Sequence, residues 1–220
     1  KYGFVLGRLF KWNAAVTALN KAISYNPDAT DYSNVGWAYY NAAQVDLINK
    51  QQDSAKSKLQ LGRAALEKAV AIDSKSKAAY MNLGVTQSDL GDYAGAIESM
   101  KKCLALQPDW FLALNEMGLA YRGLGNLGEA VKSFKRASEI AENKLSGAKT
   151  ELEKSIGIQQ NASSLFNLAM TEVDRGNEKE ARKAQEKLKK YDPNRAKLVE
   201  VNIINKIKNK IPVKNPLNNV

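Results

Sequence analysis

Apolar residues recur at three- and four-residue spacing through most of the chain, which is the period of a helix with one buried face. Pro27, Pro108 and Pro193 stand where such segments end. Proline lacks the amide N–H and disfavours helix in the residue before it. The pattern therefore predicts an all-α protein of amphipathic helices joined by short turns.

The helical pattern repeats with a period of 34 residues. Residues 78–109 align with residues 112–143 without a gap, and a third copy follows at residues 163–194. A fourth copy is split by about 14 extra residues, and a fifth, at the N-terminal end, lacks the start of its first helix. Because one copy cannot bury its apolar side alone, neighbouring copies are expected to stack.

This repeat resembles the tetratricopeptide repeat, in which paired antiparallel helices stack into a superhelix. One copy carries the family positions Tyr80, Leu83-Gly84, Ala96 and Pro108. The next copy carries Met117-Gly118, Tyr121, Ala130 and Phe134. The resemblance implies an all-α, right-handed superhelical solenoid of about four repeats plus a partial N-terminal one, and a terminal capping helix.

The copies also predict how the chain is divided. We expect the solenoid to span residues 1–193, and the incomplete first copy indicates one part of a longer protein. The predicted segments are a partial repeat (1–28), a repeat with a helical insertion (29–76), a repeat (77–110), a repeat plus insertion (111–161), a repeat (162–193), a capping helix (194–211) and a flexible basic tail (212–220).

Two insertions interrupt the period. The first, within residues 41–60, is polar and free of proline. It predicts a protruding helical hairpin that turns near Gln51–Ser54, with a flexible loop as the alternative. The second, residues 143–160, also favours helix. Either the preceding helix runs through it or the helix breaks at Ser146-Gly147. Part of this segment echoes an earlier second helix and is interpreted as a remnant of one.

The capping helix is predicted from a last amphipathic segment with lysines on its other faces. A solenoid needs a terminal element that shields its last apolar face, so we expect one stripe of this helix to be buried. The stripe contains Leu198, Val201, Ile204, Ile207 and Ile211.

Gly123, Gly125 and Gly128 form a G-x-G-x-x-G pattern of the kind found in dinucleotide-binding loops. Such a loop follows a strand, whereas a helical segment precedes these glycines. Only Gly125 recurs in other copies, as Gly91 and Gly176. The pattern therefore predicts a turn between two helices, where glycine adopts left-handed backbone at low cost.

Composition argues against catalysis. The 220 residues include no histidine and one cysteine, Cys103, so the usual general base, the commonest metal ligands and a disulfide framework are missing. Acids such as Asp46, Glu151 and Glu153 are expected to be scattered over helix surfaces. We predict no enzyme and no cofactor. No apolar run approaches the roughly 20 residues of a membrane span, so no membrane partner is expected within this chain. The compartment is not predicted.

The net charge of +10 is concentrated at one end, since residues 187–220 carry nine basic and two acidic side chains. An alternative function is therefore a basic docking module that holds nucleic acid or an anionic surface. Tyr191 is the one aromatic residue of this segment, so recognition of single strands by stacking is not expected.

The resemblance further implies a binding face on the first helices of the repeats. In the family, an asparagine before the Leu-Gly pair often contacts the backbone of an extended peptide, to which its amide offers a donor and an acceptor. The main predicted function is a non-enzymatic adaptor that binds a peptide or protein segment in a concave groove. Packing between repeats is the alternative role of the apolar members. The candidates are Asn34, Trp37, Tyr40, Asn82, Val85, Asn115, Glu116, Leu119, Arg122, Asn167 and Met170.

A subset of the family grips the C-terminal carboxylate of chaperones with lysines, asparagines and an arginine. The matching lysine and arginine positions here hold Ser33, Ala78, Met81, Leu112 and Glu116. The resemblance therefore does not extend to chaperone binding, and neither the protein partner nor the oligomeric state is predicted.

Overall fold

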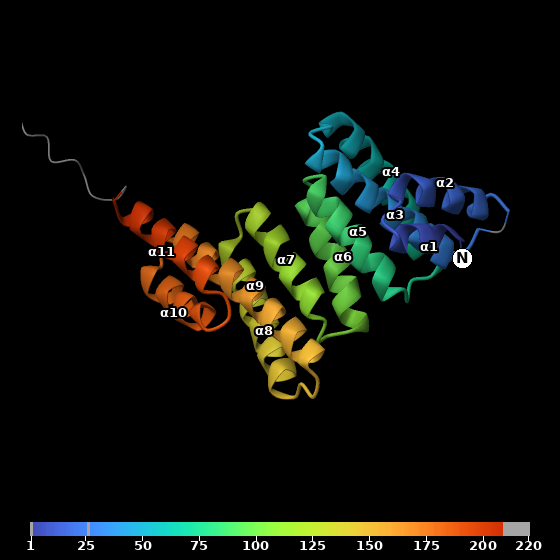
Figure 1. Cartoon of the computed structure of the whole chain (residues 1–220). Coiled ribbons are helices and arrows are strands. Elements are labelled where there is room, and N and C mark those ends of the chain that lie inside the picture. Colours follow the sequence, from blue (N-terminus) through green and yellow to red (C-terminus); the bar gives the residue numbers. More distant parts are fainter. Residues whose placement is uncertain (1, 26, 209–220) are drawn as a thin grey trace, which may run out of the picture. The chain divides into compact units, whose positions relative to one another are not determined.

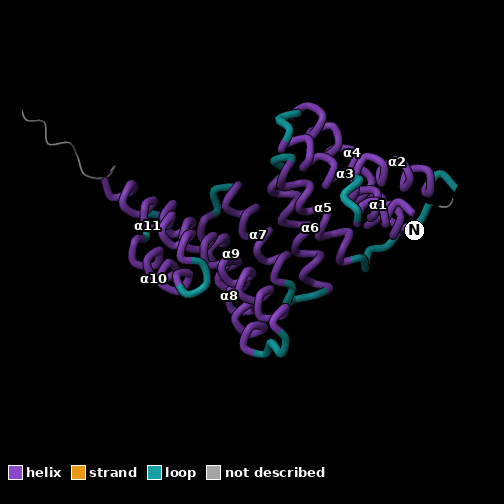
Figure 2. The backbone as a smooth tube through the Cα atoms, viewed as in Figure 1, coloured by secondary structure: helices purple, strands orange, loops and turns teal. Residues whose placement is uncertain are grey.

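The structure is a computed structural model that describes residues 2–25 and 27–208. In these ranges the chain forms eleven helices and no strand (Figures 1 and 2). The predicted all-α class is confirmed. The expected tail, residues 212–220, and Ile211 lie outside the described residues.

The chain divides into two compact units, and unit 1 is Lys1–Leu124. Its helices are α1 (Tyr2–Arg8), α2 (Trp12–Ile23), α3 (Ala29–Ile48), α4 (Gln52–Ile72), α5 (Lys77–Asp89), α6 (Tyr93–Leu106) and α7 (Phe111–Gly123). Each helix packs on the next, and α5 also contacts both α3 and α7. The first helices of successive repeats, α3, α5 and α7, therefore lie side by side.

The first insertion lengthens α3 and α4 into a helical hairpin that turns at residues 49–51. Inside this hairpin Asp46 is buried, although the sequence suggested a surface acid. Its carboxylate lies 2.7 Å from Lys58 Nζ and accepts a hydrogen bond of 2.5 Å from Ser54 Oγ. These two contacts hold the pKa of Asp46 below its usual value. The acid therefore ties the two long helices together near their turn.

Unit 2 is Gly125–Val220. Its described helices are α8 (Leu127–Ser146), α9 (Glu151–Arg175), α10 (Glu178–Lys189) and α11 (Pro193–Lys208). The long helix α9 contacts the other three. Phe134, Leu188 and Val199, from three different helices, are fully buried in this unit.

The second insertion breaks at Ser146-Gly147, one of the two predicted alternatives. A capping box then starts α9, in which Glu153 N donates to Thr150 Oγ1 at 3.1 Å and Thr150 N donates to Glu153 Oε2 at 3.0 Å. These reciprocal bonds satisfy amide groups that a helix start leaves unpaired. Because α9 continues to Arg175, residues 151–160 begin the first helix of the last repeat and are not a remnant of a second helix.

The last helix, α11, packs on α9 and α10 with a different face from the predicted one. Val199 and Ile203 are buried, whereas Leu198, Val201 and Ile204 are exposed. The helix is apolar on two sides, and a helical period alone cannot decide which side meets the neighbouring helices. The expectation that the stripe of Leu198 would be buried is wrong.

The turn glycines behave as predicted. Gly91, Gly125 and Gly176 have φ angles of 81°, 75° and 74°. A Cβ atom added at Gly91 or Gly125 would meet nothing within 4 Å, so the backbone conformation, and not lack of space, favours glycine there. With α7 ending just before Gly125, the G-x-G-x-x-G pattern is a helix–helix turn.

Cys103 lies in the core of unit 1, where it packs with Met100 and Ala113. It is fully buried. Burial raises the pKa of its thiol to about 11.

Candidate functional site

Nine candidate residues belong to unit 1, on the helices that lie side by side. They are Asn34, Trp37 and Tyr40 on α3, Asn82 and Val85 on α5, and Asn115, Glu116, Leu119 and Arg122 on α7. Asn115 is buried and the other eight are half-buried. We call this surface the α3–α5–α7 face.

Tyr40 and Glu116, two polar members of this face, lie close to Asp89, at the end of α5. The Tyr40 hydroxyl donates a hydrogen bond to the Asp89 carboxylate. Gln44 Nε2 donates to Asp89 Oδ2 at 2.7 Å. From α7, Asn115 donates to the Glu116 carboxylate, which lies close enough to feel the charge of Asp89. These five residues, the polar cluster, connect three consecutive repeats.

The surroundings of the polar cluster disfavour the charged form of its two carboxyl groups, those of Asp89 and Glu116. Burial raises the pKa of Glu116 above its usual value, and the charge of Asp89 adds to the effect. Asp89 is exposed, but partial desolvation also raises its pKa, against the hydrogen bonds from Gln44 and Tyr40. Burial and the two carboxylates raise the pKa of Tyr40 well above its usual value. The groups that donate hydrogen bonds to these two acids, Gln44, Tyr40 and Asn115, are all neutral.

Two apolar candidates take part in packing. The Trp37 ring centroid lies 4.9 Å from that of Trp12 and 5.7 Å from that of Phe4. Val85 packs against the cluster that contains Met100. The alternative role of inter-repeat packing therefore fits Trp37 and Val85.

Sequence reasoning missed Asp89 and Gln44. Both continue the helical spacing of recognised candidates, since Asp89 follows Asn82 by seven residues and Gln44 follows Tyr40 by four. Residues at these spacings share one face of a helix. Extending each candidate stripe by one turn would have found both.

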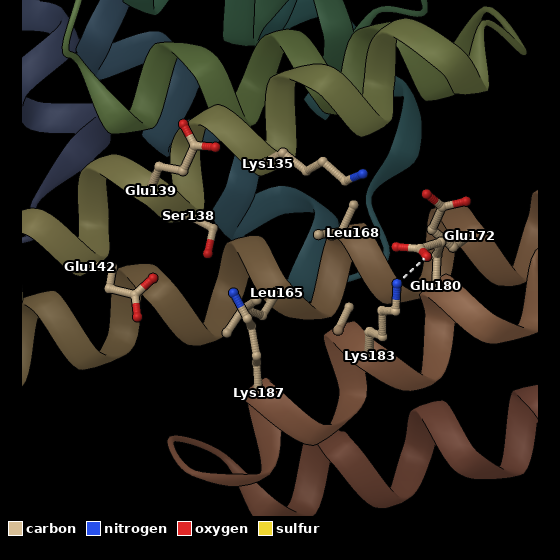
Figure 3. Close-up of a pocket in the computed structure, with 11 residues that line it drawn as sticks. Lys135, Ser138, Glu139, Glu142, Leu165, Leu168, Glu172, Glu180, Lys183 and Lys187 are labelled. Carbon is tan, nitrogen blue, oxygen red and sulfur yellow. Dashed lines mark hydrogen bonds and ion pairs between the residues drawn. The ribbon is translucent and has the colours of Figure 1, made fainter.

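The candidates of unit 2, Asn167 and Met170, lie on α9 and are half-buried. The same helix lines a cavity of about 240 Å³ with Leu165 and Leu168, together with residues of α8 and α10 (Figure 3). Positions two residues apart on a helix point to nearly opposite sides. The two candidates therefore face away from this cavity.

Two of the acids that line the cavity, Glu172 and Glu180, are paired with basic side chains of the same unit. Lys183 Nζ lies 2.6 Å from Glu180 Oε1, drawn as the dashed line in Figure 3. The buried carboxylate of Glu172 accepts a hydrogen bond of 3.1 Å from Arg175. The cavity therefore combines aliphatic side chains with paired acids. This arrangement does not by itself activate a nucleophile.

Residues 2–25 and 27–208 offer neither a metal site nor a membrane span. They contain no group of three His, Cys, Asp or Glu side chains arranged to hold a metal ion. None of their helices combines the length and the apolar character that crossing a membrane requires.

The repeat pattern has an independent counterpart among known families. A family model described as "Tetratricopeptide repeat" matches residues 78–109, 112–144 and 162–195. The chain is a tetratricopeptide-repeat protein. Proteins of this family are generally non-enzymatic interaction scaffolds, and the repeats make this chain a protein–protein interaction scaffold.

Curated relatives match part of this tetratricopeptide-repeat chain. Heat shock protein STI1 of Saccharomyces cerevisiae is 30% identical over 95 residues, which cover 43% of the chain and 16% of the relative. The sti1 homolog of Schizosaccharomyces pombe is 32% identical over 66 residues, or 30% of the chain and 11% of the relative. The chain thus spans less than a fifth of the length of either relative.

Solved tetratricopeptide-repeat structures match nearly the whole chain. A crystal structure of MamA has a TM-score of 0.65 at 17% identity and covers 93% of this chain and 98% of its own. TTC0263, a thermophilic TPR protein of Thermus thermophilus, has a TM-score of 0.57 at 18% identity and covers 94% and 96%. These similarities establish the solenoid fold.

Proposed function

We propose that the tetratricopeptide-repeat chain is an adaptor that binds an extended peptide segment of a protein partner on the α3–α5–α7 face. The observation that carries the proposal is the polar cluster, in which side chains from three consecutive repeats converge on Asp89 and Glu116. A row of polar groups across neighbouring helices suits a ligand that runs across them.

The cluster also supports a preference among peptides. Two carboxylates with raised pKa values lack a positive counter-charge among the groups that hydrogen-bond them, Gln44, Tyr40 and Asn115. A lysine or arginine of the peptide would supply that charge and form charge-assisted hydrogen bonds. We therefore expect a basic residue in the bound segment, next to backbone contacts made by Asn34 and Asn82.

Selection from a library of random peptides displayed on phage tests the proposal with the full chain as bait. Selected peptides should be enriched in lysine and arginine, and calorimetry should give a saturable isotherm. Asn82→Ala combined with Leu119→Ala should weaken binding by roughly tenfold or more. The control pair Asn49→Ala with Leu106→Ala, both exposed and outside this face, should bind like the parent.

Two outcomes would count against the proposal at different levels. If selected peptides bind the variant with Asn82→Ala and Leu119→Ala as tightly as the parent, their binding site lies elsewhere on the chain. Peptides that bind on this face but carry no basic residue would remove the charge preference and leave the face assignment intact. Glu116→Gln separates these cases, because it should reduce affinity only for basic peptides.

A further inference from the structure

A second surface, with a chemistry of its own, lies on α11, the last labelled helix of Figure 1. Leu198, Val201 and Ile204 are 50%, 52% and 38% exposed. Their three-residue steps place them along one side of the helix, and we call them the outer stripe. At 3.6 residues per turn the outer stripe lies nearly opposite Val199 and Ile203, which are buried against α9 and α10.

Lysines accompany the outer stripe. Helical spacing places Lys197 and Lys208 on the same side of α11 as Val201 and Ile204. Both lysines are exposed, and no ion pair holds their amines within the part of the chain that the structure describes. This side of α11 is therefore both aliphatic and cationic.

The acids of the same segment do not offset these lysines, because arginines already engage them. Glu200 accepts a hydrogen bond of 2.9 Å from Arg182 and another of 2.9 Å from Gln185. Asp192 lies 3.4 Å from Arg195. Positive charge at this end of unit 2 is left without a counter-charge from these carboxylates.

We infer that the outer stripe docks on an anionic phospholipid surface, with its aliphatic side chains in the bilayer interface and Lys197 and Lys208 against the headgroups. Exposed aliphatic residues beside lysines are the pattern of helices that lie in the membrane interface. The inference specifies the anionic surface of the alternative function, the basic docking module. It departs from the expectation of no membrane partner, which rested on the lack of a membrane-spanning apolar run. A helix that lies in the interface needs no such run.

Other binding partners would match only one of the two features of this surface, either its aliphatic residues or its lysines. Nucleic acid would bind the lysines through its phosphates but leave the outer stripe in water. A second copy of the chain would cover the aliphatic residues but bring the same lysines together across a symmetric contact, where like charges repel. An anionic bilayer accommodates both features.

Sedimentation of the full chain with lipid vesicles tests the inference. Binding to vesicles of phosphatidylcholine and phosphatidylserine should be at least about tenfold stronger than to phosphatidylcholine alone, and added salt should weaken it. Leu198→Ser, Val201→Ser and Ile204→Ser combined should lower this binding by about tenfold or more. A matched control, Leu61→Ser with Ile72→Ser and Leu106→Ser, changes three exposed aliphatic residues of unit 1 and should bind like the parent.

A second variant distinguishes a loss of vesicle binding from a loss of folding. Lys197→Glu with Lys208→Glu leaves the aliphatic residues unchanged and should give a comparable loss, with the helical signal of the parent. The inference is overturned by a lack of vesicle binding, by equal binding to both vesicle types, or by triple-serine binding that matches the parent. A dimer that the triple-serine variant dissociates, or binding to duplex DNA without binding to vesicles, would also overturn it.

Discussion

At Glu116, the proposed role in binding and the stability of the free protein make opposite demands. Burial beside Asp89 raises its pKa above the usual value. A carboxyl whose pKa rises on folding keeps its proton longer in the folded state. Stability is therefore lost as pH increases from the unfolded-state pKa through the folded-state pKa. At neutral pH, the charge on Glu116 destabilises the free protein.

Replacing this carboxyl should therefore stabilise the fold. Glu116→Gln should raise the free energy of unfolding at pH 7 by up to about 1 kcal/mol, and the gain should shrink toward about pH 4, where the parent is protonated as well. Thermal unfolding at the two pH values measures the effect. Glu98→Gln, an exposed acid paired with Lys101, is the control and should change little. A lower melting temperature for Glu116→Gln at pH 7 would contradict the account.

Two glycines of one turn should respond to alanine with opposite signs. Gly125 has a φ of 75°, so Gly125→Ala should destabilise by about 1–2 kcal/mol. Gly128 lies in the first turn of α8, where an added Cβ meets only Asn126 Oδ1, at 3.9 Å. Gly128→Ala should therefore stabilise, by up to about 1 kcal/mol. Denaturant unfolding of both variants provides the measurement, and equal losses would be inconsistent with a helix–helix turn.

Among the elements, the α3–α4 hairpin depends on one buried acid. The depressed pKa of Asp46 means that its contribution is present at neutral pH and is lost as pH falls below the unfolded-state value through the folded-state pKa. Asp46→Asn should lower the free energy of unfolding by about 1–2 kcal/mol at pH 7. Asp53→Asn, an exposed acid of α4, should cost no more than about 0.5 kcal/mol. Similar values for the two variants would show that the buried contacts add nothing.

The helices themselves show what a linear pattern can and cannot predict. Proline positions and apolar spacing located most helices, because those signals are local. The side on which α11 packs was not predictable, because Leu198 and Val199 each begin a stripe of apolar residues along the helix. The start of α9 was visible only as Thr150 and Glu153 at capping-box spacing, a signal that the sequence analysis did not use.

At the scale of the whole molecule, a family relationship should not be equated with a shared ligand. The two curated relatives are heat shock proteins, yet the matching clamp positions here include Glu116, whose charge would repel a peptide carboxylate. We expect no saturable binding of chaperone C-terminal peptides in calorimetry, whereas a basic peptide selected on the same protein should bind. A micromolar isotherm with a chaperone peptide would contradict this expectation.

The 34-residue period was sufficient to predict the solenoid fold, because stacking is the way such repeats bury their apolar sides. The candidate site was predicted less completely. Tyr40 and Glu116 occupy different positions of their repeats, and their meeting at Asp89 depends on how α3, α5 and α7 are offset along their axes. That offset is a property of three packed helices and has no signature in any one of them.

The location of Cys103 has a practical consequence for experiments on this protein. With a pKa of about 11, its sulfur is ionised at pH 7.5 in roughly one molecule in a few thousand, and the core shields it from reagents. A fluorophore or spin label directed at a newly introduced surface cysteine should therefore attach at that position alone, with the native thiol left in place.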